Sequence, residues 1–388
     1  MIALALAGCG GSGASFGTAQ SSATKHTTVA HSGPLPASAG DWATLLHGAS
    51  HFGAAGVAGP SSATVRWQRQ LEAPISAAPV TVGSTAYIAS NGGVLHAIEI
   101  SNGKDLWTFN GGGSYGSDIP TAPTVLADGL ILWPGPRDQL FALTPKGKLR
   151  WTLTQTAQTL TPAVDQALNL LVLADTKGNL SGYRLAGDAA PTRLWTHKLD
   201  KISFGNPALA ANGTAYQTAG NSLFAVAADG RTLWQVTTTR LVEVSAAVGS
   251  DGTIVFGSDD RYEYGIAPDG TIRWAHRIGN LTYSSPFTLA GDRVIYGNHS
   301  GEMTILNSAT GHPISQDHST GQIWTAAAVD ARGDVYFGSR MGGIYGFGPS
   351  GQRLFDLTTG TKFDSYPALA TDGTLLIGDN KATLRAIR

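Results

Sequence analysis

Short apolar runs recur along the chain, and turn residues separate them at regular intervals. In residues 225–234, for example, Ala-Val-Ala-Ala closes one run, Asp229-Gly230 makes a turn, and Arg-Thr-Leu-Trp opens the next run. Short runs rich in β-branched and aromatic residues, bounded by Asp-Gly or Asn-Gly pairs, are typical of strands joined by tight hairpins. No long stretch has the 3.6-residue apolar period of a helix, so the pattern predicts an all-β chain.

One position, usually a tryptophan, marks the same place in each unit of this pattern. Successive marks are 39–44 residues apart, and they fall at Trp67, Trp107, Trp151, Trp195, Trp234, Trp274, Ser315 and Phe355. A period near forty, with strand, turn, strand, turn in each unit, is typical of a β-propeller whose blades have four antiparallel strands. The repeat predicts one large domain, because its units must stack to bury their faces.

The two ends of the repeat region predict how the ring closes. After Phe355 the chain has three expected strands, at 366–370, 374–377 and 383–387, but no outer strand. At the other end, residues 65–68 read as an outer strand with no blade before it. Pairing the two would remove two exposed sheet edges. We therefore predict eight blades, with the N-terminal strand completing the last one.

The charge composition argues against one class of partner, nucleic acids. Basic and acidic side chains number 26 and 27, the net charge is −1, and no cluster of Lys and Arg appears. A protein that binds a row of phosphates needs such a cluster. We expect no nucleic-acid partner.

The N-terminal residues carry the only cysteine, Cys9. The preceding residues 6–8, Leu-Ala-Gly, resemble the lipobox of bacterial lipoproteins, in which the cysteine takes the lipid. The apolar run before it is shorter than a full signal peptide, so we interpret residues 1–9 as a truncated signal with its lipobox. The alternative is an apolar N-terminus that contains a cysteine by chance. The lipobox interpretation predicts an exported protein, anchored in the cell envelope at the periplasmic or outer surface. Its membrane contact would then be the N-terminal lipid only.

Two further segments precede the repeats. Residues 10–40 are Gly, Ser, Ala, Thr and Pro with few large apolar side chains, which predicts a flexible tether. Large apolar residues return at 41–60, so we expect this segment to dock on the propeller and assign 41–388 to one domain. His47 and His51 stand four residues apart there and could chelate a metal on a helix. No third ligand lies nearby in sequence, so we favour packing or surface roles and predict no metal site.

The segment 97–107, which runs from Ala97 through Gly103 to Trp107, resembles the tryptophan-docking motif of PQQ-like repeat propellers. Segments 142–151, 225–234 and 265–274 repeat the motif one residue shorter, and the copies that end at Ser315 and Phe355 are weaker. An insertion at 186–191 distorts the copy that ends at Trp195. The resemblance implies a structural, blade-docking role for Trp67, Trp107, Trp151, Trp195, Trp234, Trp274 and Phe355.

Two groups within that family imply different functions. Quinoprotein dehydrogenases hold PQQ with a vicinal-cysteine disulfide, a stacking tryptophan, calcium-binding carboxylates and a catalytic aspartate. The expected propeller has no cysteine, so we do not expect PQQ or calcium and name no catalytic residue. BamB-like lipoproteins of outer-membrane protein assembly are scaffolds, and a lipobox, a tether and eight blades resemble that group better. We expect a non-redox scaffold that binds envelope proteins. The alternative is a quinoprotein-like oxidoreductase or a polysaccharide-binding or polysaccharide-active propeller.

A candidate ligand site follows from the order of the strands. Loops that enter the innermost strands and loops between the second and third strands should open on one face around the channel. The chemistry-bearing residues in these loops are Arg137, Asp138, Glu243, Asp259, Asp260, Arg261, Tyr283, His299, Trp324, Arg340 and Asp364. Glu243, Asp259 and Asp260 suit a cation or acid/base work, and Tyr283 and Trp324 suit stacking on a sugar or peptide ring. The alternative is that these loop charges are solvated or paired with each other.

Overall fold

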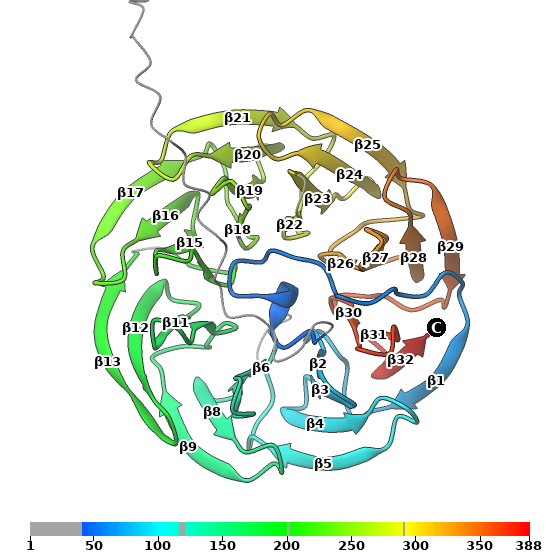
Figure 1. The fold of residues 1–388 in the computed structure, drawn as a ribbon, viewed down its shortest axis with the longest axis horizontal. Helices are drawn as coiled ribbons and strands as arrows, with labels where there is room; N and C mark the ends of the chain where they lie inside the picture. The colour runs from blue at the N-terminus through cyan, green and yellow to red at the C-terminus, as the bar shows by residue number, and fades with distance from the viewer. Residues whose placement is uncertain (1–40, 116–120, 200–201, 290–291) are drawn as a thin grey trace, which may run out of the picture. The chain divides into compact units, whose positions relative to one another are not determined.

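The computed structural model describes residues 41–388 except for 116–120, 200–201 and 290–291. The described residues form eight four-stranded antiparallel sheets, arranged as blades around a common axis (Figure 1). This confirms the predicted eight-bladed, all-β propeller. The segments 1–9 and 10–40, with Cys9, lie outside the described residues.

Each blade contributes one strand to each of four concentric rings, and blades 1 to 8 are numbered by their innermost strands in chain order. The innermost strands are β2 (Val80–Val82), β6 (Thr124–Val125), β10 (Ala163–Asp165), β14 (Ala208–Leu209), β18 (Ala247–Val248), β22 (Phe287–Leu289), β26 (Ala328–Val329) and β30 (Ala368–Leu369). The second strands are β3 (Thr85–Ala89), β7 (Ile131–Gly135), β11 (Leu170–Ala174), β15 (Ala215–Ala219), β19 (Ile254–Ser258), β23 (Arg293–Gly297), β27 (Val335–Gly338) and β31 (Leu375–Gly378).

The outer half of each blade holds the residues that carry the sequence repeat. The third strands are β4 (Val94–Glu99), β8 (Gln139–Leu143), β12 (Asn179–Ala186), β16 (Ser222–Val226), β20 (Tyr262–Ile266), β24 (Glu302–Asn307), β28 (Gly343–Phe347) and β32 (Thr383–Ile387). The outer strands are β5 (Asp105–Asn110), β9 (Leu149–Thr154), β13 (Ala189–Lys198), β17 (Thr232–Thr237), β21 (Ile272–Arg277), β25 (Pro313–His318), β29 (Arg353–Thr358) and β1 (Val65–Gln70).

The ring closes as predicted, because β1 pairs with β32 and completes blade 8. Trp67 lies opposite Ala386 in this pair, as Trp107 lies opposite Ala97 in blade 1. The two ends of the repeat region therefore share one sheet, and neither leaves a free edge there.

The tryptophans of the outer strands contact the following blade. Five indole Nε1 atoms donate hydrogen bonds of 2.6–2.8 Å to a carbonyl in its third-to-fourth-strand turn: Trp67 to Ile100, Trp107 to Pro145, Trp195 to Ala228, Trp234 to Pro268 and Trp274 to Ser308. The ring lies so close that a Cβ added to the turn residue Gly270 would approach Trp234 Cγ to 2.8 Å. A positive φ of 90° at Gly270 favours glycine there as well.

Trp151 is the exception among these tryptophans. The blade that follows it contains the insertion, which extends β12 and β13 so that they still pair at Ala186 and Ala189. Trp151 is buried, yet its Nε1 has no hydrogen-bond partner among the described residues. The insertion replaces the short turn whose carbonyl accepts the indole N–H in other blades.

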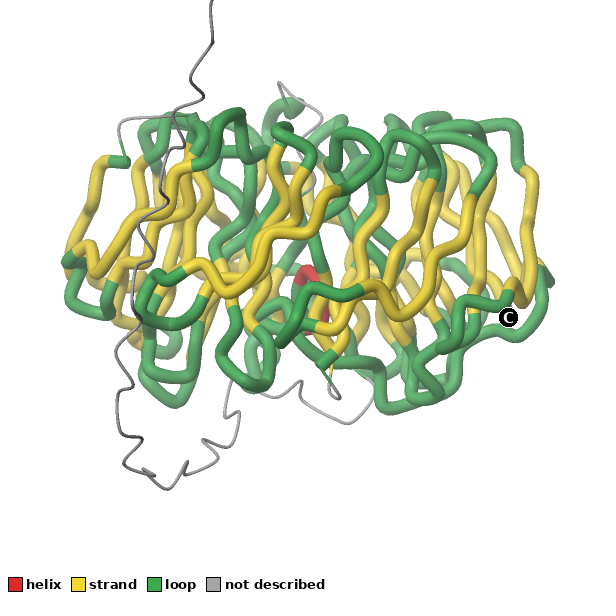
Figure 2. The backbone as a smooth tube through the Cα atoms, turned by 90° about the horizontal axis from the view of Figure 1, so that it is seen from above, coloured by secondary structure: helices red, strands yellow, loops and turns green. Residues whose placement is uncertain are grey.

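Residues 41–60 cover one end of the channel. Their backbone bonds to six innermost strands, in the pairs Trp42–Thr81, Ala43–Val125, Ala49–Leu209, Ser50–Val248, Gly53–Thr288 and Ala55–Val329. Most of these partners are the last residues of their strands, so the segment lies at the end toward which the innermost strands run. Its single helical turn, η1 (Leu45–His47), lies inside the ring in both views (Figures 1 and 2).

Both histidines of this segment make contacts within the protein; His51 is buried and His47 is half-buried. The His47 ring packs against Trp42 at a centroid distance of 5.0 Å, and His51 Nδ1 lies 2.6 Å from the Ala246 carbonyl oxygen. Burial lowers the pKa of both imidazoles to about 4. Both rings are therefore neutral at pH 7.

Candidate functional site

The opposite end of the propeller is built by one backbone hydrogen bond that recurs from blade to blade. The loop before the innermost strand, here called the leading loop, supplies the carbonyl, and the hairpin between the second and third strands supplies the N–H. In the described loops the bond measures 2.8–3.0 Å and joins Asn91 to Pro74, Thr176 to Gln158, Gly220 to Ile202, Asp259 to Leu241, His299 to Leu281, Arg340 to Gln322 and Asn380 to Lys362. We call this end the loop face.

This bond places two side chains of each blade at equivalent positions on the loop face. One belongs to the hairpin residue that donates the bond, and the other lies two residues after the acceptor. In blades 5 to 8 the pairs are Asp259 with Glu243, His299 with Tyr283, Arg340 with Trp324, and Asn380 with Asp364. We call these eight residues the mouth cluster. Seven of them are among the residues that the sequence predicted for the site; Asn380 is not.

Three aromatic rings form the centre of the mouth cluster. Tyr283 meets His299 and Trp324 edge-on, with ring centroids 4.5 and 4.7 Å apart. The rings of His299 and Trp324 are parallel, with centroids 5.1 Å apart. Neither His299 Nε2 nor Trp324 Nε1 has a hydrogen-bond partner among the described residues. Burial, and secondarily the charge of Arg340, lowers the pKa of His299, so its ring is neutral at pH 7.

A cation and a carboxylate extend the cluster into blades 7 and 8. The Arg340 guanidinium carbon lies 3.6 Å from the centroid of the Trp324 ring, within the range of a cation–π contact. Arg340 Nε and Nη2 lie 2.8 and 3.1 Å from the two oxygens of the buried Asp364. Asn380 donates to the same carboxylate at 2.7 Å. The charge of Arg340 is therefore neutralised within the protein.

On the other side of the aromatic rings, the cluster is acidic. Burial raises the pKa of Asp259 to about 6, and the neighbouring Glu243 and Asp260 raise it while Arg240 opposes them. The pKa of Tyr283 is raised to about 12 by burial and by the charges of Glu243 and Asp259. Asp259 Oδ1 has no hydrogen-bond partner among the described residues. This sector can hold a proton near neutral pH.

Four of the predicted site residues do not join the cluster. Asp260 accepts from the Tyr264 hydroxyl at 2.9 Å and from Thr239, so its carboxylate is used inside blade 5. Arg261, Arg137 and Asp138 sit in tight turns with positive φ of 59–70°, and no contact joins their side chains to the cluster within the described residues.

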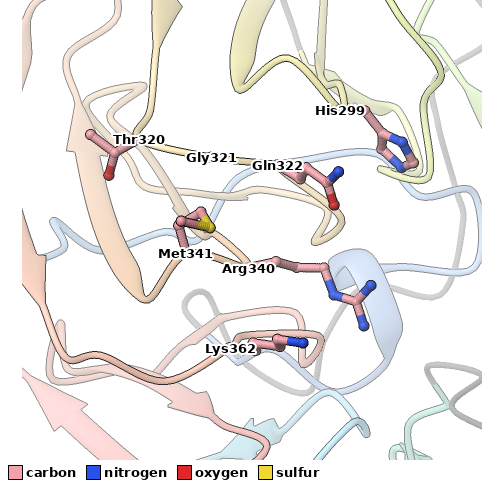
Figure 3. A pocket seen from close by; sticks show the side chains of 7 residues that line it. All are labelled: His299, Thr320, Gly321, Gln322, Arg340, Met341 and Lys362. Atoms are coloured by element: carbon pink, nitrogen blue, oxygen red, sulfur yellow. The ribbon is translucent and has the colours of Figure 1, made fainter.

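A pocket opens beside the cluster between blades 6, 7 and 8. Its volume is about 640 Å³, and its walls are residues 320–322 with His299, Arg340, Met341 and Lys362 (Figure 3). Sequence reasoning placed only His299 and Arg340 in the site. Lys362 and Gln322 could have been found from the repeat, since each supplies the leading-loop carbonyl of its blade.

Among the described residues, the loop face lacks several of the groups that the family resemblance requires for a quinone and calcium. The chain has no cysteine other than Cys9. The indole of Trp324 is covered by the Arg340 guanidinium and so offers no free face on that side. In the part of the chain that the structure describes, no group of three or more His, Cys, Asp or Glu side chains is placed to hold a metal ion.

Comparisons with known proteins give a match to one family model and to several solved structures. A family model described as outer membrane protein assembly factor BamB matches residues 11–181 and 183–388. No curated protein gives a significant match. The crystal structure of BamB from Moraxella catarrhalis is similar with a TM-score of 0.67 at 14% identity, and the match covers 84% of this chain and 99% of that one.

Other proteins, an enzyme among them, share the fold as well. Quinohemoprotein alcohol dehydrogenase from Comamonas testosteroni matches with a TM-score of 0.70 at 12% identity, over 90% of this chain and 81% of that one. Sqt1 from Saccharomyces cerevisiae matches with a TM-score of 0.70 at 11% identity, over 84% of this chain and 98% of that one. At such identities the likeness shows the fold alone.

Proposed function

Since this chain belongs to the family of PQQ-like repeat propellers whose model describes the assembly factor BamB, we propose that it is a non-redox binding scaffold of the cell envelope. The loop face is the proposed binding surface, and another envelope protein is the proposed partner. The observation that carries this proposal is the mouth cluster, in which side chains from blades 6, 7 and 8 contact one another and the charges of blade 5 act on Tyr283.

The character of the cluster supports binding more than catalysis. The Arg340 charge is already paired with Asp364, and the aromatic rings hold each other in fixed orientations. Tyr283, Trp324 and Arg340 are half-buried, and Tyr, Trp and Arg are the residue types enriched among those that dominate protein–protein affinity. A preformed surface also loses less side-chain entropy when a partner binds.

The proposed attachment to the envelope is the lipid on Cys9. The family match supports an envelope-associated protein. Among the described residues, no helix has both the length and the apolar character needed to cross a bilayer. A lipid on Cys9 would place the propeller at a membrane surface through the segment 10–40.

A second candidate function rests on the acidic sector. Asp259, with its pKa raised to about 6 beside Glu243, is a carboxyl that can hold a proton near neutral pH. The two carboxyl groups, with the aromatic ring of Tyr283 next to them, resemble the residues of a polysaccharide-binding or polysaccharide-active site. Hydrolysis of envelope polysaccharide that is lost in Asp259→Asn would favour this second function. A rise in melting temperature with PQQ and calcium would favour a quinoprotein-like one.

Affinity capture with matched variants tests the scaffold proposal. The bait is the purified full chain, and envelope proteins crosslinked to it are quantified by mass spectrometry. The Tyr283→Ala/Trp324→Ala variant should lose the enriched partner. The control, Leu106→Ala/Leu233→Ala, removes two exposed apolar side chains from outer strands β5 and β17 and should keep it. Equal capture by both variants, or no enrichment with the unmodified chain, would contradict the proposal.

A further inference from the structure

The pocket beside the mouth cluster has a charge of one sign only. Asp and Glu are absent from its described lining, while Lys362, Arg340 and His299 bring amino, guanidinium and imidazole groups to it. Arg340 is paired with Asp364, and His299 is neutral at pH 7. The Lys362 side chain is exposed and has no ion-pair partner among the described residues. The pocket therefore presents one uncompensated positive charge.

Neutral hydrogen-bonding side chains line the same pocket. His299 Nε2 is buried without a partner, and the Gln322 side chain is exposed on the same wall. Figure 3 shows the polar ends of Gln322, Arg340 and Lys362 pointing to the same side of the pocket. An ammonium group with adjacent N–H donors suits a carboxylate, which accepts several hydrogen bonds at once.

The other end of the pocket is apolar. Figure 3 places Met341 and Thr320 away from the polar ends. Met341 is 71% exposed, the largest exposed fraction among the large hydrophobic side chains of the described residues. It packs over Gly321, where an added Cβ would lie 2.0 Å from Met341 Cγ, so only a glycine allows this contact. A flexible thioether exposed in this way is a typical contact for aliphatic groups of a ligand.

Hydrogen bonds within the protein fix the loops that carry the polar and the apolar end of the pocket. Gln322 and Lys362 each accept the repeated backbone bond, from Arg340 at 2.9 Å and from Asn380 at 3.0 Å. The Thr320 N–H donates to the Tyr345 hydroxyl at 3.0 Å. The volume of about 640 Å³ lies within the range of roughly 300–1,000 Å³ typical of ligand pockets.

We propose that this pocket binds a carboxylate side chain of an extended acidic peptide, with a neighbouring aliphatic side chain against Met341. The carboxylate pairs with the Lys362 ammonium and accepts hydrogen bonds from His299 Nε2 and the Gln322 amide. This inference rests on the proposed scaffold function and specifies which part of a partner the loop face recognises.

Two peptides that differ in one group test the proposal on the full chain. The probes are acetyl-Leu-Glu-Leu-amide and acetyl-Leu-Gln-Leu-amide, and isothermal titration calorimetry measures their affinities. The Glu peptide should bind about tenfold more tightly than the Gln peptide, because only the carboxylate forms charge-assisted bonds. Lys362→Gln should abolish this preference, and Lys362→Arg should keep it. The control Lys148→Gln removes the same charge from an exposed turn residue between β8 and β9 and should change nothing.

Several outcomes would overturn the proposal. They are equal affinity for the two peptides, an unchanged preference in Lys362→Gln, or no binding of either peptide. Binding of phosphatidylglycerol vesicles through Lys362 without binding of the Glu peptide would assign the pocket to a membrane surface instead. Failure of the scaffold function gives a different result, since the capture experiment would then enrich no partner. If a partner is captured equally by the unmodified chain and by Lys362→Gln, only the pocket inference is lost.

Discussion

The outer wall of the propeller and its loop face are built on the same repeat, yet they use it in opposite ways. On the outer wall the repeated position holds tryptophan in six blades, and five of these indoles make the same bond to the next blade. On the loop face the position two residues after the acceptor holds Phe204, Glu243, Tyr283, Trp324 and Asp364 in successive blades. Identical side chains at equivalent positions serve the fold. Different side chains at equivalent positions give a surface its specificity.

The largest expected effect comes from removing one of the repeated contacts. Trp274 is buried, donates to the Ser308 carbonyl at 2.6 Å, and lies against Gly311 of the next blade. Trp274→Ala should lower the free energy of unfolding by about 3–5 kcal/mol, because it leaves a cavity and an unpaired carbonyl between blades 5 and 6. Urea unfolding followed by circular dichroism measures the change.

Ser315 provides the control, because it stands at the same position in blade 6 without an indole. Its hydroxyl has no hydrogen-bond partner among the described residues. Ser315→Ala should change the free energy of unfolding by less than about 1 kcal/mol. Equal losses in Trp274→Ala and Ser315→Ala would show that the indoles do not set the strength of the contact between blades.

The difference between the two regions also explains what sequence reasoning could predict. The tryptophan spacing and the unpaired strands at both ends of the repeat region led to the eight blades and the β1–β32 pair. These features recur or complement each other in the sequence itself. The pairing of Arg340 with Asp364 and the separation of Asp260 from the cluster depend on side-chain rotamers within loops. No periodic pattern encodes those, so the sequence indicated the loops but not the contacts.

The segment 41–60 shows the same limit at the other end of the channel. Its large apolar residues predicted that it packs on the propeller. Its backbone bonds to six blades have no sequence signature, because they form between irregular backbone and strand ends. Positive φ at Leu46, His47 and His51 gives the segment a shape that no helical or strand periodicity describes.

One position in the core departs from the repeat, because a carboxyl group occupies it in blade 5 and an apolar side chain in the other blades. The third strand of each blade has a fully buried residue two places before the one that pairs with the repeated outer-strand position. These residues are Leu95, Leu140, Leu180, Leu223, Glu263, Met303, Ile344 and Leu384. Both oxygens of Glu263 have no hydrogen-bond partner among the described residues. Burial raises the pKa of this carboxyl well above its ordinary value.

Glu263→Leu should therefore raise the free energy of unfolding by about 1–3 kcal/mol at pH 8. A raised folded-state pKa means that stability is greatest below the ordinary value of 4.5 and falls as the pH rises toward the folded-state value. The advantage of Glu263→Leu should accordingly be smaller at pH 4 than at pH 8. Urea unfolding at the two pH values measures it, with Met303→Leu as a pH-independent control at the same position of blade 6. A loss of stability in Glu263→Leu would show that the carboxyl has a partner.

The smallest expected effect concerns the loop face. Removing a single charge there should shift the pKa of a neighbouring carboxyl and leave the fold intact. Glu243→Gln removes one of the charges that, together with burial, raise the pKa of Asp259 to about 6. The pKa of Asp259 should fall part of the way toward its ordinary value of 3.8, because burial remains the larger cause. Ionisation of Asp259 lowers stability between its unfolded-state and its folded-state pKa. This pH range should become narrower by the same amount as the folded-state pKa falls. Carboxyl ¹³C NMR titration of Asp259 measures the shift, and the melting temperature should stay nearly constant. Asp269→Asn, which removes a carboxylate from the turn between β20 and β21, is the matched control and should leave Asp259 unchanged. If Glu243→Gln also leaves the pKa of Asp259 unchanged, the charge of Glu243 does not contribute to raising it, and burial remains the main cause.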